Sequence, residues 1–263
     1  MSIPNRLVQL YREGGLKEVI RGIRDFVTFT LGDTIGRIRA RWPRPMRSMI
    51  ADEACLWEIR SSRDYRRFKQ ACELREPVDW LLQDASEDDV LWDIGAHHGL
   101  YTVPAALKGV SVIAVEPYPP SIERLHTHIR LNAIEERVEV VESALGMAEG
   151  TARISTSAHD ATATVAPNQE ADTSTGDHVE VPMIRGASLP GPSPTLLMID
   201  VEGLELDVLE GLGARLETVR RAVVEVHEGV DIEQVRASFD EFDIEIRPRI
   251  RQDHLLASLA TPR

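Results

Sequence analysis

Residues 90–101 have the sequence VLWDIGAHHGLY, and this stretch decides the fold. VLWDI is a short apolar run of strand length, and Gly95 and Gly99 follow it at the spacing of a tight turn into a helix. Glycine permits a positive φ at such a turn and lets a ligand approach the backbone without an intervening Cβ. We therefore predict a strand, a turn and a helix that bind a ligand. On this view Gly95→Val abolishes ligand binding and leaves the fold largely intact.

Downstream of this turn, short apolar runs alternate with helical patterns, as is typical of βαβ units around a parallel sheet. The predicted strands span residues 90–94, 111–116, 138–142, 195–200, 221–227, 242–246 and 254–259. The predicted helices span residues 99–108, 119–132, 203–216 and 231–240. Residues 157–178 are polar and aperiodic, so we predict a loop there. The sequence thus predicts a Rossmann-like α/β domain over residues 86–263.

Residues 1–85 are predicted to form a helical N-terminal extension to that domain. Apolar residues recur at helical spacing among arginines over residues 1–50 until two prolines break the pattern. A second helical stretch over residues 61–84 divides into two helices near Pro77. We expect the first segment to pack on the main domain as a lid. Contact with an anionic membrane surface or with a partner is the alternative.

The formal charge of −13 is unevenly distributed along the chain. The first 75 residues contain 16 Arg and Lys against 9 Asp and Glu, whereas residues 76–263 contain 14 against 34. The acidic part argues against a nucleic-acid partner. No apolar run approaches the roughly 18 residues of a membrane span, and the first residues lack the apolar core of a secretory signal. We therefore expect a cytoplasmic protein, with peripheral contact at the inner membrane face as the alternative.

An acidic residue at the end of the second predicted strand fits a nucleoside-binding site. Glu116 follows Gly95 by 21 residues, and an acidic side chain at that place accepts hydrogen bonds from ribose hydroxyls. A GxGxxG turn suits pyrophosphate, but Asp93 and His97 occupy the positions of its first two glycines. A carboxylate instead suits the ammonium group of a methionine moiety, which favours S-adenosylmethionine over NAD. An NAD- or nucleotide-sugar-dependent enzyme, or a relative that binds cofactor without turnover, is the alternative.

Two further acidic motifs follow later strands. Asp200 and Glu202 come at the end of the fourth predicted strand, and Glu225 and His227 at the end of the fifth. Because ligands bind beyond the carboxyl ends of strands in an open α/β sheet, we expect these side chains in the same crevice as the first turn. Period-two alternation places Glu225 and His227 on one side of their strand. Glu205 is expected mainly to complement the dipole of a helix start.

No metal site is predicted. Adjacent histidines such as His97 and His98 usually point apart, and no HxH or HxxE pattern flanks them. A magnesium ion held by Asp200, Glu202 and Glu225 is the less favoured alternative.

The order of these motifs resembles the FkbM-type family of S-adenosylmethionine-dependent methyltransferases. The resemblance is carried by DIGAHHGLY at 93–101, EP at 116–117, ESALG at 142–146, MIDVEGLELDVLEGL at 198–212 and VVEVHE at 223–228. It implies the class I methyltransferase fold, with a seven-stranded, mostly parallel sheet whose last strand is antiparallel and with helices on both faces.

The resemblance also implies site residues. Those lining the cofactor would be Asp93, Gly95, Ala96, Gly99, Tyr101 and Glu116, with Ser143 and Ala144 near the adenine. Those facing the methyl acceptor would be Asp200, Glu202, Glu225 and His227. The chain departs from the family with His97 where Asn is common, Met198 where Lys is common, and no aspartate at 185–189. The last two departures concern the acceptor side.

Members of this family mostly methylate hydroxyl groups of sugars, glycolipids or secondary metabolites. The resemblance therefore implies an O-methyltransferase whose acceptor is a small molecule, a glycan or a lipid-linked sugar. Methyl transfer is an in-line displacement on an activated sulfonium, so positioning supplies much of the rate. An alcohol acceptor also needs a base, for which His227 or Asp200 is the candidate. A carboxylate acceptor such as a uronic acid needs none.

Overall fold

The structure is a computed structural model that describes Ile38 and residues 45–73, 75–155, 165–167, 178–248 and 252–259. The chain divides into two compact units, one of residues 1–48 and 56–74 and the other of residues 49–55 and 75–263. Most of the helical pattern predicted over residues 1–50 lies outside the described residues, so the lid and membrane interpretations of it stay predictions. Within the described part of the chain, every helix is too short or too polar to cross a membrane.

A β-hairpin that the sequence analysis missed precedes the first described helices. It consists of β1 (Met46–Ile50) and β2 (Glu53–Trp57), which begin after the two prolines that were predicted to break the helical pattern. Ala51 and Asp52 between the strands have φ of 50° and 66°. Two successive positive φ values are typical of a tight hairpin turn, but such turns usually contain Asn or Gly. The sequence Ala-Asp therefore gave no local indication of it.

The helical stretch predicted over residues 61–84 forms two helices, as expected. α2 spans Ser62–Glu73, and the Oγ of Ser61 accepts a hydrogen bond from the backbone N–H of Asp64 (3.1 Å) at its start. α3 spans Glu76–Leu82 and has Pro77 in its first turn, where a missing N–H costs no hydrogen bond.

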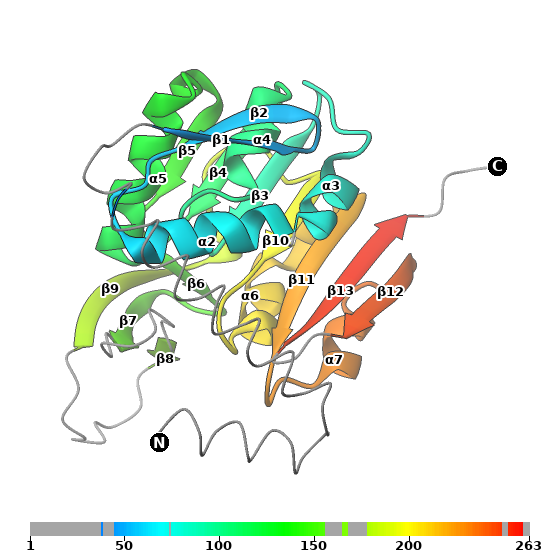
Figure 1. Cartoon of the computed structure of the whole chain (residues 1–263). Coiled ribbons are helices and arrows are strands. Elements are labelled where there is room, and N and C mark those ends of the chain that lie inside the picture. Colours follow the sequence, from blue (N-terminus) through cyan, green and yellow to red (C-terminus); the bar gives the residue numbers. More distant parts are fainter. Residues whose placement is uncertain are drawn as a thin grey trace, which may run out of the picture. The chain divides into compact units, whose positions relative to one another are not determined.

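The second unit contains the predicted seven-stranded sheet (Figure 1). Its strands are β3 (Val90–Ile94), β4 (Ser111–Val115), β5 (Val138–Val141), β10 (Leu196–Ile199), β11 (Arg221–His227), β12 (Phe242–Pro248) and β13 (Gln252–Leu259). Their order across the sheet is β12-β13-β11-β10-β3-β4-β5. Neighbouring strands from β11 through β10, β3 and β4 to β5 are parallel. β13 is antiparallel to both of its neighbours, β11 and β12. The class I methyltransferase arrangement is thus confirmed.

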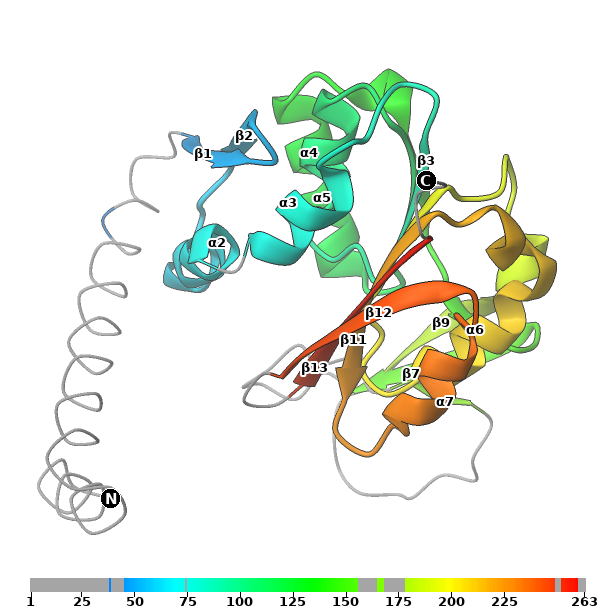
Figure 2. The same ribbon diagram turned by 90° about the vertical axis from the view of Figure 1, so that its right-hand side faces the viewer.

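Helices cover both faces of this sheet, as predicted. α3, α4 (Thr102–Leu107) and α5 (Pro119–Leu131) lie on one face, and α6 (Glu205–Leu212) and α7 (Ile232–Ala237) on the other (Figure 2). All four residues of β10 are buried because central strands are covered from both sides. The helix predicted over residues 203–216 is shorter than expected. Gly213, with φ of 51°, ends α6, and a 3₁₀ turn continues to Thr218.

A second, four-stranded sheet was not predicted. It has the order β6-β9-β7-β8 and consists of β6 (Ala144–Gly146), β7 (Gly150–Ser155), β8 (Val165–Pro167) and β9 (His178–Arg185). β8 interrupts the loop predicted over residues 157–178, and the rest of that segment lies almost wholly outside the described residues. The loop prediction is therefore wrong at β8, since a three-residue strand is too short to show a period of two.

The carboxyl ends of β3 and β10 meet at Gly95. The backbone N–H of Asp200 donates to the carbonyl of Ile94 (2.9 Å), which continues the pairing of the two strands. Gly95 has φ of +86°, and a Cβ on it would lie 1.9 Å from the carbonyl oxygen of Asp200. The prediction that Gly95→Val leaves the fold largely intact is therefore wrong. The end of the neighbouring strand fills the space that a side chain needs.

We expect Gly95→Ala to destabilise the protein much more than Gly229→Ala. Gly229 also has a positive φ (+94°), but nothing lies within 4 Å of the position of its Cβ. Gly229→Ala therefore costs only the strain of a left-handed alanine, about 1 kcal/mol. Gly95→Ala causes a similar backbone strain and also forces two strand ends apart. The separation costs roughly 1–3 kcal/mol or more in addition. Urea unfolding of the full chain measures both losses, and equal losses would show that the strand ends separate at no cost.

Candidate functional site

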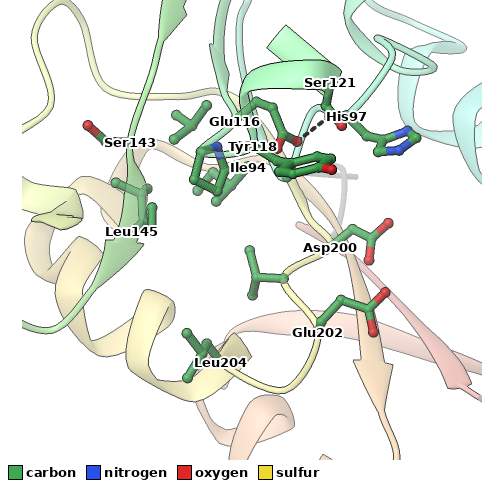
Figure 3. Close-up of a pocket in the computed structure, with 15 residues that line it drawn as sticks. Ile94, His97, Glu116, Tyr118, Ser121, Ser143, Leu145, Asp200, Glu202 and Leu204 are labelled. Carbon is green, nitrogen blue, oxygen red and sulfur yellow. Dashed lines mark hydrogen bonds between the residues drawn. The ribbon is translucent and has the colours of Figure 1, made fainter. Parts of the chain in front are cut away.

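A pocket opens at the carboxyl ends of β3, β4 and β10, with about 680 Å³ of empty space that continues into solvent (Figure 3). Its walls come from the turn after β3, the end of β4 with the start of α5, the strand β6, and the loop between β10 and α6. The predicted site residues that line it are Gly95, Glu116, Ser143, Ala144, Asp200 and Glu202. Its place agrees with the rule that ligands bind beyond the carboxyl ends of strands in an open sheet.

Glu116 is held in this pocket by two backbone N–H groups. Its Oε2 accepts a hydrogen bond from the N–H of His97, drawn in Figure 3, and its Oε1 accepts one from the N–H of Tyr118, each at 2.8 Å. The residue is only 5% exposed. A carboxylate can accept about four hydrogen bonds, so these two fix its orientation and leave capacity for hydroxyl donors of a ligand.

Asp93 lies behind the pocket rather than in its wall. It is buried, and its Oδ2 accepts hydrogen bonds from the backbone N–H (3.0 Å) and the hydroxyl (2.5 Å) of Thr102. Burial raises the pKa of Asp93 to about 6, although both hydrogen bonds oppose the rise. Asp93 therefore fastens the start of α4 to the end of β3.

Three other predicted residues of the first motif also lie outside the pocket wall. Ala96 and Tyr101 are buried and do not line the pocket. Gly99 has φ of +88°, and a Cβ on it would lie 2.8 Å from the side chain of Leu125 in α5. Glycine at this position lets α5 pack closely against the turn.

Much of the apolar wall of the pocket was not predicted from the sequence. The lining residues that it did not single out include Ile94, Val115, Tyr118, Leu145, Val201 and Leu204. Tyr118 lies beside Glu116 in Figure 3, and both Tyr118 and Leu204 pack against the buried residues of the four-stranded sheet. That sheet therefore supports the pocket. Tyr118 directly follows the Glu-Pro motif, which was the one local signal for it.

Asp200, Glu202 and His227 come together at the edge of the pocket, as predicted from their strand ends. The Nε2 of His227 lies 3.4 Å from an oxygen of Glu202 and 3.7 Å from an oxygen of Asp200. Glu202 has φ of +47°, a left-handed conformation that costs a non-glycine residue on the order of 1 kcal/mol. His227 and Glu225 do not line the pocket themselves. Burial raises the pKa of Asp200 most, and the negative charge of Glu225 raises it further.

Glu205 has a different role from the predicted one. Its side chain is fully buried, and its Oε1 lies 2.6 Å from the Nδ1 of His227. The same oxygen accepts hydrogen bonds from the backbone N–H groups of Gly203 (3.2 Å) and His227 (3.3 Å). The prediction that Glu205 mainly complements the helix dipole is therefore wrong. Glu205 orients the imidazole, because α6 and the end of β11 pack against each other.

The surroundings of His227 favour its protonated form. Burial lowers the pKa of His227, but the hydrogen bond to Glu205 and the charges of Glu202 and Asp200 outweigh it and raise the pKa to about 9. A protonated imidazole cannot accept another proton. His227 can therefore act as a general base only after it has lost this proton.

The two adjacent histidines do not point apart, contrary to expectation. The rings of His97 and His98 are stacked, with centroids 3.9 Å apart and an angle of 19° between their planes. The left-handed φ of His97 (48°) turns its side chain back over its neighbour.

We expect Glu205→Gln to lower the pKa of His227 from about 9 toward its ordinary 6.5, because it removes the charge that holds the imidazolium. Glu210→Gln makes the same charge change at an exposed position of the same helix and leaves that pKa unchanged. NMR titration of the imidazole, in protein treated with EDTA, measures the value.

The sign of the linked stability change follows from the direction of the pKa shift. Because folding raises the pKa of His227, its protonation stabilises the fold fully below pH 6.5, and this stabilisation disappears as the pH rises to about 9. A wild-type pKa near 6.5 would contradict the role of Glu205.

Comparisons with known proteins identify relatives of the chain. It is 29% identical over 224 residues to the hexuronic acid methyltransferase AglP of Haloferax volcanii, a match that covers 84% of this chain and 86% of that protein. It is 33% identical over 92 residues to a tRNA (guanine(37)-N(1))-methyltransferase of Anopheles gambiae, covering 35% of this chain and 16% of that protein. A solved structure, the methyltransferase FkbM of Methylobacillus flagellatus, is similar with a TM-score of 0.49 and 14% identity, over 89% of this chain and 59% of that one.

A family model gives the match that decides membership. The model described as the methyltransferase FkbM domain matches residues 93–251, which is more than half of the chain. The matched segment contains every residue that lines the pocket. The chain therefore belongs to the FkbM methyltransferase family.

Proposed function

We propose that this methyltransferase uses S-adenosylmethionine and transfers the methyl group to an oxygen of a hexuronic acid residue in a glycan. The pocket around Glu116 carries the first part of the proposal, because it offers a fixed carboxylate beside an apolar wall at the carboxyl end of the sheet. The relation to AglP, over most of both chains, supports the second part.

The pocket suits a nucleoside. Glu116 has the position and the hydrogen-bonding capacity to accept the ribose hydroxyls. Tyr118, Leu145 and Leu204 offer apolar surface to an adenine, and Ser143 and Ala144 lie at the same wall. Asp93 and Gly99 hold the turn of Gly95 in place from behind.

S-adenosylmethionine, when bound, supplies a methyl group on a sulfonium. The chain has to place an acceptor oxygen in line with the carbon–sulfur bond that breaks, and to keep water out. Asp200 and Glu202 lie on the open side of the pocket, opposite the wall of β6, and are therefore proposed to face the acceptor (Figure 3).

A carboxylate acceptor needs no base from this site. It is already anionic, so its oxygen attacks the methyl carbon without losing a proton, and positioning alone can supply much of the rate. A hydroxyl acceptor would require a base, and His227 is held by Glu205 and two further carboxylates in its protonated form. A hydroxyl acceptor would then depend on Asp200, the other candidate base, whereas the carboxylate of a hexuronic acid depends on neither residue, so we take the carboxylate as the acceptor.

The cofactor is tested by binding of S-adenosylhomocysteine to the full chain. We expect it to raise the melting temperature, because a ligand that binds only the native state stabilises it, whereas NAD should give no shift. Glu116→Gln should weaken binding at least about tenfold, since an amide presents a donor to one of the two backbone N–H groups. Glu139→Gln, at an exposed position of β5, is the matched control. Stabilisation by NAD alone would contradict the proposal.

The acceptor is tested by mass spectrometry of glycans incubated with the enzyme and S-adenosylmethionine. We expect a gain of one methyl group on an oligosaccharide that contains hexuronic acid, and no reaction after its carboxyl group is reduced to an alcohol. Mild alkali should remove the added methyl group, because it cleaves esters and leaves ethers intact. An alkali-stable product would show that a hydroxyl group is the acceptor.

A further inference from the structure

Three side chains at the edge of the pocket present ligand atoms toward one another. One atom each of Asp200, Glu202 and His227 can be chosen so that all three lie within 4.8 Å of one another. Ligands of Mg²⁺ or Mn²⁺ lie about 2.1 Å from the ion, hence about 3 Å apart when adjacent and about 4.2 Å apart when opposite. The spacing is therefore close to that of a coordination sphere, and the set comes from the ends of two adjacent strands.

The distances from the Nε2 of His227 to the two carboxylates fit ligands around a shared ion better than they fit a direct ion pair. The Nε2 of His227 is 3.4 Å from Glu202 and 3.7 Å from Asp200. Charge-assisted hydrogen bonds between nitrogen and oxygen measure about 2.7–2.9 Å. A shared cation would occupy the space between the three atoms.

Glu205 provides an independent observation that points to a ligand. A histidine that binds a metal almost always donates its other ring N–H to a carboxylate, which fixes its tautomer and orientation. Glu205 does this for His227 at 2.6 Å from a fully buried position, and leaves Nε2 directed at the two carboxylates. Its second oxygen is buried without a hydrogen-bond partner in the described part of the chain.

The charge around the cluster also favours a bound cation. Asp200, Glu202 and Glu205 surround a single imidazole, and the charge of Glu225 acts on Asp200. The residues that line the pocket include no Lys or Arg. An anionic acceptor would therefore be repelled from this edge of the pocket in the absence of a bound cation.

We propose that Asp200, Glu202 and His227 bind a divalent cation of the Mn²⁺ or Mg²⁺ class, which takes the place of the proton on the Nε2 of His227, and that this cation binds the carboxylate of the acceptor. Carboxylate oxygens suit both ions, and the imidazole adds affinity for Mn²⁺. The role toward the acceptor rests on the proposed function. The binding of the cation itself does not, because it depends only on these side chains.

Isothermal titration of EDTA-treated full-length protein with MnCl₂ tests the site. We expect a single Mn²⁺ to bind the wild type, and Asp200→Asn or Glu202→Gln to weaken it at least tenfold. Glu205→Gln should weaken it to a smaller extent, because it removes only the orienting partner. Glu210→Gln, exposed on the same helix, should bind as the wild type does. Circular dichroism and melting curves confirm that each variant is folded.

Methyl transfer in EDTA, with and without added Mn²⁺, tests the role toward the acceptor. We expect EDTA to abolish transfer to the hexuronic acid, Mn²⁺ to restore it, and S-adenosylhomocysteine to bind equally in both buffers. If wild-type protein binds no Mn²⁺ and transfers methyl groups in EDTA, the cation site is wrong and the proposed function stands. If Mn²⁺ binds but S-adenosylhomocysteine does not, the proposed function is wrong and the cation site stands.

Discussion

The contact between the turn after β3 and the end of β10 is the constraint on which the site depends. The carbonyl oxygen of Asp200 fills the space of a side chain at Gly95, so the two strand ends approach as closely as backbones can. The hydrogen bond from Asp200 to Ile94 holds that approach. As a result Glu116, fixed by the backbone after Gly95, and the acidic residues after β10 face one pocket. A wider gap would separate Glu116 from Asp200 and Glu202.

Buried groups behind the pocket fix the imidazole of His227. Glu205 extends from the start of α6 to the imidazole at the end of β11 and fixes it against two further carboxylates. Placing like charges around one imidazole, with Glu202 in a left-handed conformation, opposes folding. Such local conflicts are expected at functional sites, where stability is lost in favour of a prepared environment for a ligand. The same feature supports the proposed cation site.

The four-stranded sheet gives the pocket its apolar wall. β6 contributes Ala144 and Leu145 directly, and the buried side chains of β7 and β9 pack against Tyr118 and Leu204. α6 approaches β6 closely, since a Cβ on Gly211 would lie 2.1 Å from the carbonyl oxygen of Gly146. The small sheet therefore contacts both the pocket, through β6, and α6, the helix that carries Glu205. β8 has only three residues and cannot show a period of two, so the sequence predicted a loop there.

The sequence by itself determined the seven strands of the main sheet, their covering helices and the set of strand ends that carry Glu116, Asp200, Glu202 and His227. Apolar periodicity and turn glycines encode these features locally, within a few residues, and the topology of parallel sheets brings their carboxyl ends to one edge. Only the tertiary structure decided what each side chain does there. Glu205 and His227 are 22 residues apart, and Gly95 and Asp200 are more than 100 apart, so their contacts arise from packing of separate elements. For the same reason Asp93 turned out to hold a helix start, and Tyr118 to form a wall of the pocket. Local sequence fixes where a residue lies along its element, whereas burial and hydrogen-bond partners fix its role.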